Sequence, residues 1–522
     1  MTALNPRSSW QARLAGAAFL FAGVSRFAAG AAELPVKLGT IAIAPGPFQP
    51  TWESLRQYRC PEWFKDAKFG IWSHWGPQCV PEQGDWYARN LYREGSPHYK
   101  HHVATYGHPS EFGYKDIVKL WKAEKFDPDA LMAKYVKAGA KYFVSMGVHH
   151  DNFDLWNSRH TTWNAVKMGP HRDIVGDWAA AARRHGLRFG VSEHLERTYA
   201  WFNTNKGADK TGPKAGVPYD GNDPRFSDFY LTKHDDTREV YPIDPPAWWR
   251  QHWYDRVSDL VENYHPDLVY TDGGVPFGGV GRSLIAHFYN LNLARHGGKL
   301  EAVYNIKNDP RHQHGEYVDG IAVEDLERAA LDGIKAEPWQ TCSSVADWFY
   351  SKRYRVKTPA WAIHLLADIV SKNGNLLLNF TQHPDGTLAP ESELILDELA
   401  AWMPVNGEAI FGTRPWRVYG EGPSTIAKGR LVEGRTKYTA EDIRFTTKGD
   451  TLYAIVLGWP EGGALVIKSL ATGPDETAVG AVRLLGADGD LKTSRDETGL
   501  KVELPAEAPT RHAVVLAIQL AK

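Results

Sequence analysis

The stretch that runs KYFVSM (residues 141–146), DIVGDWAAAARRH (residues 173–185) and RFGVS (residues 188–192) contains a strand, an amphipathic helix and a second strand. Both short segments are apolar without alternation, which is typical of strands buried on both faces of a parallel sheet. The longer segment between them has the apolar spacing of a helix with one buried face. The order therefore predicts a β-α-β unit.

The same unit recurs about eight times along the first four hundred residues. Such repetition favours a (β/α)8 barrel over an open sheet, and we expect this TIM-like barrel to occupy residues 55–405. Further amphipathic helices are expected at residues 128–138 and 249–264. The seventh strand has the weakest pattern. The expected strands are residues 69–73, 141–146, 188–192, 267–270, 301–305, 320–324, 343–349 and 375–379.

The pattern changes after residues 406–408. Strand-like segments of four to seven residues then recur, with Gly and Asp in the turns between them. This pattern is typical of an antiparallel β-sandwich, which we place at residues 415–522. The expected strands are residues 443–446, 451–457, 464–467, 481–485 and 512–518.

Composition excludes several classes of function. The chain has 522 residues, and its 60 Lys and Arg against 62 Asp and Glu leave a formal net charge of -2. A chain so balanced lacks the basic surface that nucleic acid or an anionic membrane requires, so neither is an expected partner. The 20 Trp, 23 Tyr and 20 Phe modestly favour a sugar-binding enzyme, because aromatic rings pack on the apolar faces of sugars.

The amino-terminal residues have the features of an export signal. Arg7 and Arg13 precede an apolar run at residues 14–24, and small residues at 28–32 offer a cleavage site. We therefore expect a signal peptide at residues 1–32 and a protein that acts in the periplasm or outside the cell. The three cysteines contain no CxxC pair, and we expect all of them to be free rather than joined in one Cys60–Cys79 bridge.

Polar residues follow several of the expected barrel strands. In a (β/α)8 barrel the reacting groups lie at the carboxyl ends of the strands, so these positions are candidates for one site. The His149–His150 pair suggests a metal, but adjacent residues of a strand point to opposite faces, and no HxxxH or HExxH completes a ligand set. We expect no metal and no cofactor, and we interpret the histidines as ligands for a polyhydroxylated substrate, together with Trp86 and Tyr87.

Asp272 is the strongest catalytic candidate. It follows an apolar strand and precedes two glycines, which allow a sharp turn at the barrel mouth. Glycosidic hydrolysis needs two carboxyl groups, one ionised and one protonated. Glu324, Asp325 and Glu327 are the candidates for the second. Strand alternation directs Asp325 and Glu327 to one face and Glu324 to the other, and this pattern alone leaves the three alternatives open.

These residues resemble the α-L-fucosidases of glycoside hydrolase family 29. The similarity runs from about residue 63 through the barrel into the sandwich. The matching segments are WFKDAKFGIWSHWG (63–76), GDWY (84–87), GVHHDNFDLWNS (147–158), LVYTDG (268–273), PWQTCSSVADWFY (338–350), KNGNLLLN (372–379) and NGEAIFGTRPW (406–416).

The resemblance implies a retaining, metal-independent exo-hydrolase that acts on a fucosylated oligosaccharide or glycoconjugate. It implies that Asp272 is the nucleophile, and that Glu327 best matches the acid/base residue, with Glu324 and Asp325 as alternatives. This chain has Gln340 where many relatives have Glu, and we expect that position to be supportive. The residues implied to bind the sugar are His74, Trp86, His149, His150, His194, Trp348 and Tyr350.

Two other functions stay open at this point. An α-L-galactosidase would use the same mechanism on a sugar that has one more hydroxyl, at C6, and an apolar pocket rejects an added hydroxyl only weakly. A non-catalytic carbohydrate-binding protein would have one of the two carboxylates lost or misplaced.

Overall fold

Eight parallel strands form a closed barrel in which neighbours in sequence pair and β1 also pairs with β8. The predicted (β/α)8 barrel is thereby confirmed. The computed structural model describes residues 41–236, 241–308, 315–329, 331–424, 429, 436–473 and 478–520, and the expected signal at residues 1–32 lies outside them. The barrel strands are β1 (Phe69–Ser73), β2 (Tyr142–Val148), β3 (Arg188–Glu193), β4 (Leu268–Thr271), β5 (Val303–Ile306), β6 (Val323–Asp325), β7 (Trp339–Ser344) and β8 (Gly374–Asn379).

The seventh strand was predicted too late in the chain. It begins at Trp339, whereas the sequence pattern suggested residues 343–349. The reason is Gln340, which is fully buried inside the barrel and hydrogen-bonds with Asp325 and Tyr142. A polar residue at an interior position hides a buried strand from a search for apolar runs.

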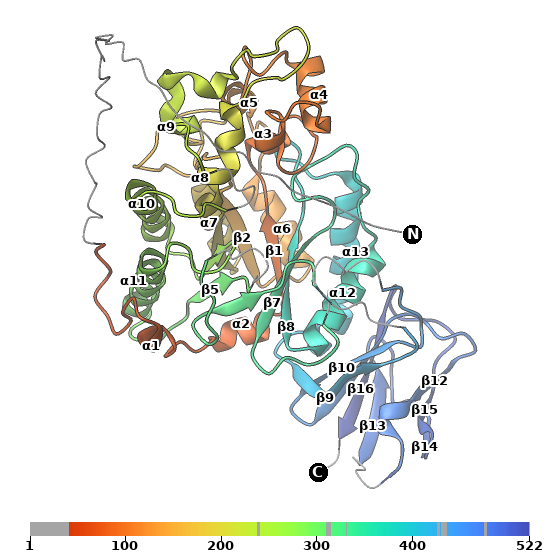
Figure 1. Ribbon diagram of the computed structural model, residues 1–522. Helices are drawn as coiled ribbons and strands as arrows, with labels where there is room; N and C mark the ends of the chain where they lie inside the picture. Colours follow the sequence, from red (N-terminus) through yellow and green to blue (C-terminus); the bar gives the residue numbers. More distant parts are fainter. Residues whose placement is uncertain are drawn as a thin grey trace, which may run out of the picture. The chain divides into compact units, whose positions relative to one another are not determined.

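Helices cover the outside of the barrel, and α10 and α11 lie side by side there (Figure 1). The helix α7 shows why such segments form: Asp173 caps it by accepting a hydrogen bond from the Gly176 N–H, and Trp178 packs on Phe143 of β2. The helices are α1 (Trp52–Leu55), α2 (Glu62–Ala67), α3 (Tyr87–Asn90), α4 (Pro97–Thr105), α5 (Tyr114–Leu120), α6 (Pro128–Lys137), α7 (Ile174–Arg184), α8 (Thr198–Trp201), α9 (Ser227–Tyr230), α10 (Ala247–Tyr264), α11 (Gly279–Arg295), α12 (Pro359–Ser371) and α13 (Pro390–Asn406).

The carboxy-terminal part contains two antiparallel sheets around their own apolar core. One sheet has the order β13-β16-β11-β10-β9, and the other has the order β12-β15-β14. Three of these strands, β9, β14 and β15, were absent from the sequence prediction. The strands are β9 (Arg414–Glu421), β10 (Ile443–Lys448), β11 (Thr451–Val456), β12 (Ala464–Ile467), β13 (Val479–Leu484), β14 (Thr493–Asp496), β15 (Gly499–Glu503) and β16 (Val514–Leu520).

A buried ion cluster joins the barrel to this carboxy-terminal domain. Arg444 of β10 donates from Nε to Asp368 of α12 at 2.6 Å, and Lys372 contacts the same carboxylate at 2.7 Å. Arg444 and Asp368 are both almost fully buried. Buried charges are retained only when they are paired and hydrogen-bonded, so the two domains share one electrostatic unit.

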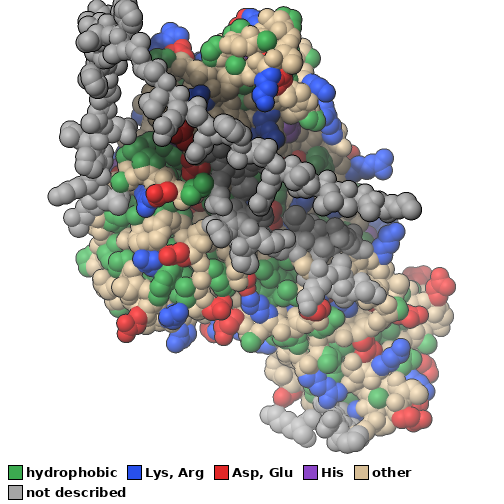
Figure 2. Space-filling view, in the orientation of Figure 1, with side chains coloured by type: hydrophobic (Ala, Val, Ile, Leu, Met, Phe, Trp, Pro, Cys, Tyr) green, Lys and Arg blue, Asp and Glu red, His purple; other side chains and the backbone are tan. Residues whose placement is uncertain are grey.

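On the face that Figure 2 shows, acidic and basic side chains are interspersed among apolar and neutral ones. None of the described helices is long and apolar enough to cross a bilayer. All three cysteines are free, as the sequence predicted.

Candidate active site

A cavity of about 250 Å³ opens at the carboxyl ends of the barrel strands, where the sequence placed the site. Its walls come from the ends of β1 to β6 and from the loops that follow several barrel strands, so residues from Trp72 to Trp348 meet here. The lining residues are Trp72, His74, Asp85, Trp86, His149, His150, His194, Arg197, Tyr270, Asp272, Lys307, Glu327 and Trp348.

Asp272 follows β4 directly and has two cations as partners. Its Oδ1 lies 2.5 Å from Lys307 Nζ, and its Oδ2 lies 2.7 Å from Arg197 Nη2. Burial by itself raises the pKa of Asp272, but Arg197 and Lys307 outweigh burial and hold this pKa well below its usual value. The Asp272 side chain is therefore ionised in the free protein.

Lys307 also brings Asp272 and Glu327 together. Its Nζ lies 2.8 Å from Glu327 Oε2 as well as 2.5 Å from Asp272 Oδ1. The two carboxylate oxygens are therefore no further apart than the sum of these distances, about 5.3 Å. Retaining glycosidases have carboxyl groups about 5–5.5 Å apart and inverting ones about 6.5–9.5 Å, so this upper limit on the oxygen–oxygen distance favours the retaining arrangement.

Four histidines lie on the floor of the cavity. The rings of His149 and His150 are 4.2 Å apart, and those of His149 and His194 are 5.0 Å apart. Neither ring nitrogen of His74 forms a hydrogen bond within the described part of the chain. Burial is the main reason why the pKa of each of the four lies below its usual value, so the rings are neutral hydrogen-bonding groups.

Tryptophans supply the apolar walls. Trp72 and Trp348 have ring centroids 5.5 Å apart, and Trp348 lies 5.4 Å from the ring of His74. Trp86 has a φ of 64°, a left-handed conformation that is strained for a bulky residue. Such strain persists at functional sites when the surrounding packing imposes it, and here it turns Trp86 into the cavity.

Of the expected sugar-binding residues, Tyr87 and Tyr350 do not line the cavity. The hydroxyl of Tyr87 lies 2.8 Å from His102 Nδ1, and the ring of Tyr350 packs at 4.0 Å on His383. Tyr87 begins helix α3 immediately after the left-handed Trp86, so the two neighbours point in different directions. The other six expected residues, His74, Trp86, His149, His150, His194 and Trp348, all line it.

The two alternative acids also lie outside the cavity lining. Glu324 pairs with Lys335. Asp325 is inside the barrel, where it accepts hydrogen bonds from Gln340 and Cys342, and burial raises its pKa to about 6. Glu327 alone of the three lines the cavity.

Sequence reasoning missed Arg197, Lys307 and Asp85. Lys307 follows β5 directly. The criterion that selected Asp272, a polar residue at the carboxyl end of a barrel strand, therefore applies to Lys307 as well. Asp85 stands in the GDWY segment, but it was not selected. Burial, followed by the nearby charge of Asp347, raises the pKa of Asp85 well above its usual value.

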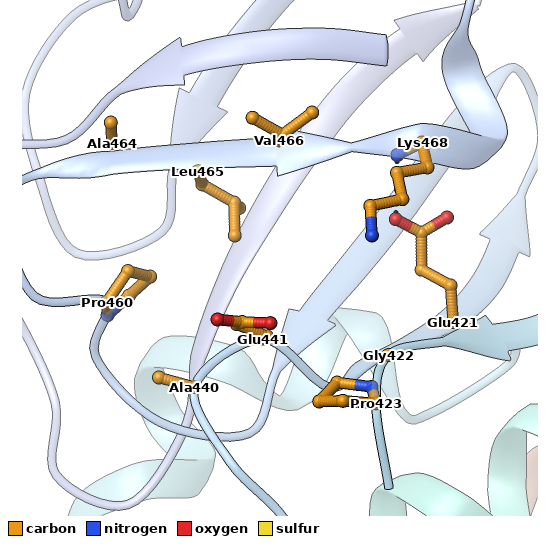
Figure 3. A pocket seen from close by; sticks show the side chains of 10 residues that line it. All are labelled: Glu421, Gly422, Pro423, Ala440, Glu441, Pro460, Ala464, Leu465, Val466 and Lys468. Atoms are coloured by element: carbon orange, nitrogen blue, oxygen red, sulfur yellow. Dashed lines mark hydrogen bonds between the residues drawn. The ribbon is translucent and has the colours of Figure 1, made fainter. Parts of the chain in front are cut away.

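A second cavity, of about 310 Å³, lies in the carboxy-terminal domain (Figure 3). Its lining is aliphatic and charged, and none of its ten residues is aromatic. The Glu421 carboxylate at its edge accepts hydrogen bonds from the main-chain N–H groups of Lys468 and Ser469, both at 2.7 Å. Glu421 therefore ties β9 to the turn after β12.

Comparison with known proteins agrees with this geometry. A family model described as alpha-L-fucosidase matches residues 38–408, and a model of the alpha-L-fucosidase C-terminal domain matches residues 436–519. The chain is 30% identical to mouse tissue alpha-L-fucosidase over 484 residues, which cover 90% of this chain and 93% of the mouse protein. It is likewise 30% identical to human tissue alpha-L-fucosidase over 483 residues, or 90% of each chain.

Solved structures give the same result. A Thermotoga maritima alpha-fucosidase in complex with a mechanism-based inhibitor has a TM-score of 0.69 and 28% identity, covering 90% of this chain and 100% of that one. The barrel and its pair of carboxylates define a glycoside hydrolase. The chain belongs to the alpha-L-fucosidase family.

Proposed function

We propose that the protein hydrolyses terminal α-L-fucosides of glycans and retains the anomeric configuration. Asp272 is the nucleophile and Glu327 is the acid/base residue in this proposal. The observation that carries it is the contact of one ammonium group, that of Lys307, with both carboxylates. This contact keeps the two acids within the spacing that a double displacement requires.

In the first step the ionised Asp272 attacks the anomeric carbon while Glu327 donates a proton to the leaving oxygen. The fucosyl–Asp272 ester that results has no negative charge on Asp272. Of its two carboxyl partners, Lys307 then has only Glu327 left to pair with as an anion. The ammonium charge therefore favours the ionised form of Glu327. That form is the base that activates water in the second step, and water releases fucose from Asp272.

Substrate hydroxyls have suitable partners in the four histidines, and Trp72, Trp86 and Trp348 provide the apolar surface for the sugar ring and its methyl group. The Thermotoga maritima relative was solved in complex with a mechanism-based inhibitor, which supports a covalent intermediate here by analogy.

Intact mass analysis tests this function. The protein is incubated with a 2-fluoro-fucosyl donor, and the mass should rise by one fluoro-fucosyl group in the natural protein but not in the Asp272→Ala variant. Labelling that persists in Asp272→Ala, or natural protein that neither labels nor hydrolyses an aryl α-L-fucoside, contradicts the proposal.

The alternatives receive less support. A non-catalytic binding protein would need one carboxylate lost or misplaced, whereas Asp272 and Glu327 both line the cavity. L-galactosides, which add one hydroxyl to the methyl group, should be slow substrates rather than preferred ones, because an apolar pocket discriminates against an added hydroxyl by about 100-fold.

We also propose that residues 1–32 direct export, and that the mature enzyme acts in the periplasm or outside the cell on fucosylated oligosaccharides or glycoconjugates, without a nucleic-acid or membrane partner. The charge pattern of residues 7–32 supports export. Cell fractionation and the amino-terminal sequence of the exported protein test it, and a full-length protein retained in the cytoplasm contradicts it.

A further inference from the structure

Two neighbouring histidines of the cavity, His149 and His150, each have one ring nitrogen bound by a group of known hydrogen-bonding type. A neutral imidazole carries hydrogen on one nitrogen and a lone pair on the other. The partner of the first nitrogen therefore fixes what the second nitrogen offers to a ligand.

Gln78 is the partner of His149. Its Oε1 accepts a hydrogen bond from the main-chain N–H of Ala88 at 3.2 Å, and its Nε2 lies 2.7 Å from His149 Nδ1. The amide cannot be flipped, because its NH2 group would then face the N–H of Ala88. Gln78 Nε2 is consequently the donor, His149 Nδ1 is the acceptor, and the hydrogen of His149 is on Nε2.

His150 has the opposite arrangement. Its Nδ1 lies 2.7 Å from the main-chain oxygen of His194, which only accepts, so the hydrogen of His150 is on Nδ1. Burial, followed by the charges of Arg197 and His194, holds the pKa of His150 well below its usual value, and the ring is neutral. Its Nε2, which lies 3.6 Å from Asp272 Oδ2, keeps a lone pair.

We propose that Gln78 and the main-chain oxygen of His194 hold His149 and His150 in opposite tautomers, so that the cavity offers the sugar one N–H donor and one nitrogen acceptor from adjacent rings. The inference rests on the proposed function, since it assumes that a sugar occupies the cavity. Gln78 is a positioning residue, fully buried beside His149. The specificity for the sugar hydroxyls comes from the opposite tautomers of His149 and His150, of which Gln78 fixes the first.

The assignment also bears on metal binding. His74, His149 and His194 bring one nitrogen each within 4.8 Å of one another, an arrangement that resembles a three-histidine metal site. A nitrogen that carries hydrogen has no lone pair for a metal ion. The hydrogen on His149 Nε2 therefore withholds that nitrogen from a cation and offers it to a sugar oxygen.

Neutron diffraction from deuterium-exchanged crystals of the free protein tests the tautomers directly. We expect deuterium on His149 Nε2 and on His150 Nδ1, with none on His149 Nδ1 or His150 Nε2. Deuterium on either of the last two atoms overturns the proposal. This measurement needs no substrate, so it stays separate from the proposed function, which fails if an aryl fucoside is not hydrolysed.

Inhibition by L-fucose analogues tests whether the cavity offers the sugar one N–H donor and one nitrogen acceptor. Each hydroxyl except the anomeric one is replaced in turn by hydrogen and by fluorine, which accepts a hydrogen bond weakly and never donates one. At the hydroxyl that faces His150, fluorine should raise the inhibition constant as much as hydrogen does, about tenfold or more. At the hydroxyl that faces His149, fluorine should be tolerated better than hydrogen. Equal effects of fluorine and hydrogen at every position overturn the proposal.

Variants test whether Gln78 fixes the tautomer of His149. Gln78→Met should abolish the difference between fluorine and hydrogen at the His149-facing hydroxyl and leave the His150-facing hydroxyl unchanged. Gln382 is the matched control, since it is also almost fully buried and its side chain hydrogen-bonds with Ser73 and Gly386 rather than with a histidine ring of the described residues. A difference that survives in Gln78→Met, or that disappears in Gln382→Met as well, overturns the role of Gln78. The neutron result on the natural protein decides the tautomers if Gln78→Met does not fold.

Discussion

Arg197 and Asp272 contact each other twice through one nitrogen. Nη2 of Arg197 lies 2.7 Å from the carboxylate Oδ2 of Asp272 and 2.8 Å from its main-chain oxygen. Tyr241 completes the arrangement, because its ring lies 4.3 Å below the guanidinium and its hydroxyl donates to the same main-chain oxygen. The proposed nucleophile, Asp272, is thus held by both its side chain and its backbone.

This double contact predicts that the shape of Arg197 matters as well as its charge. Arg197→Lys keeps the cation but loses the planar group that reaches both oxygens and stacks on Tyr241. Loss of a charge-assisted hydrogen bond should lower kcat by about 10- to 100-fold with little change in KM. Steady-state kinetics on an aryl fucoside measure this, and a Lys variant with natural kcat would contradict the role.

Removal of Lys307 should shift the acidic limb of the activity profile. Lys307 and Arg197 hold the pKa of Asp272 below its usual value, so Lys307→Met should raise that pKa and move the acidic limb of kcat/KM to higher pH. Lys307→Arg keeps the charge and serves as the control. A limb that stays at the same pH in Lys307→Met would mean that another group titrates there.

Two acid variants distinguish the proton donor. Glu327→Gln should lower kcat/KM by about 100- to 10,000-fold on fucosides with poor leaving groups, and much less on activated aryl fucosides that need no proton. Glu324→Gln is the matched control, because Glu324 pairs with Lys335 outside the cavity lining, and it should be near normal. The reverse ranking of these two variants would assign the role to Glu324.

Asp325 should make stability depend on pH. Burial raises its pKa from 3.8 to about 6, so the folded protein holds this proton more tightly than the unfolded chain. The stabilisation is complete below about pH 4 and falls by about 3 kcal/mol as pH rises to about 6. Asp325→Asn should flatten the loss of melting temperature across this window. Parallel curves for the variant and the natural protein would contradict the assignment.

Much of the fold could be read from the sequence because the barrel strands are continuous apolar runs. The exceptions have physical reasons. The β7 strand has a buried Gln340 in its interior, and β14 is a short strand without a buried residue, whose residues, TSRD, give no apolar signal. Patterns of hydrophobicity detect burial among apolar residues and do not detect burial among paired polar ones.

The candidate site was only partly predictable. Asp272 and the histidines follow strands directly, so strand ends were sufficient to select them. Arg197 belongs to a short helical turn after β3, and its role depends on Tyr241, more than forty residues further on, which sequence spacing does not relate to it. Tyr87 does not line the cavity although its neighbour Trp86 does, because the left-handed backbone conformation of Trp86 turns the two side chains in different directions.

The Arg444–Asp368 pair has a consequence for anyone who dissects this enzyme. Cutting the chain between the barrel and the sheets would leave Arg444 on the carboxy-terminal fragment without its partner Asp368. It would also expose the face of α12 on the barrel fragment that the sheets cover. A barrel expressed by itself should therefore be prone to aggregate even though every catalytic group is still present. By covering this face of α12, the carboxy-terminal sheets should therefore keep the barrel from aggregating.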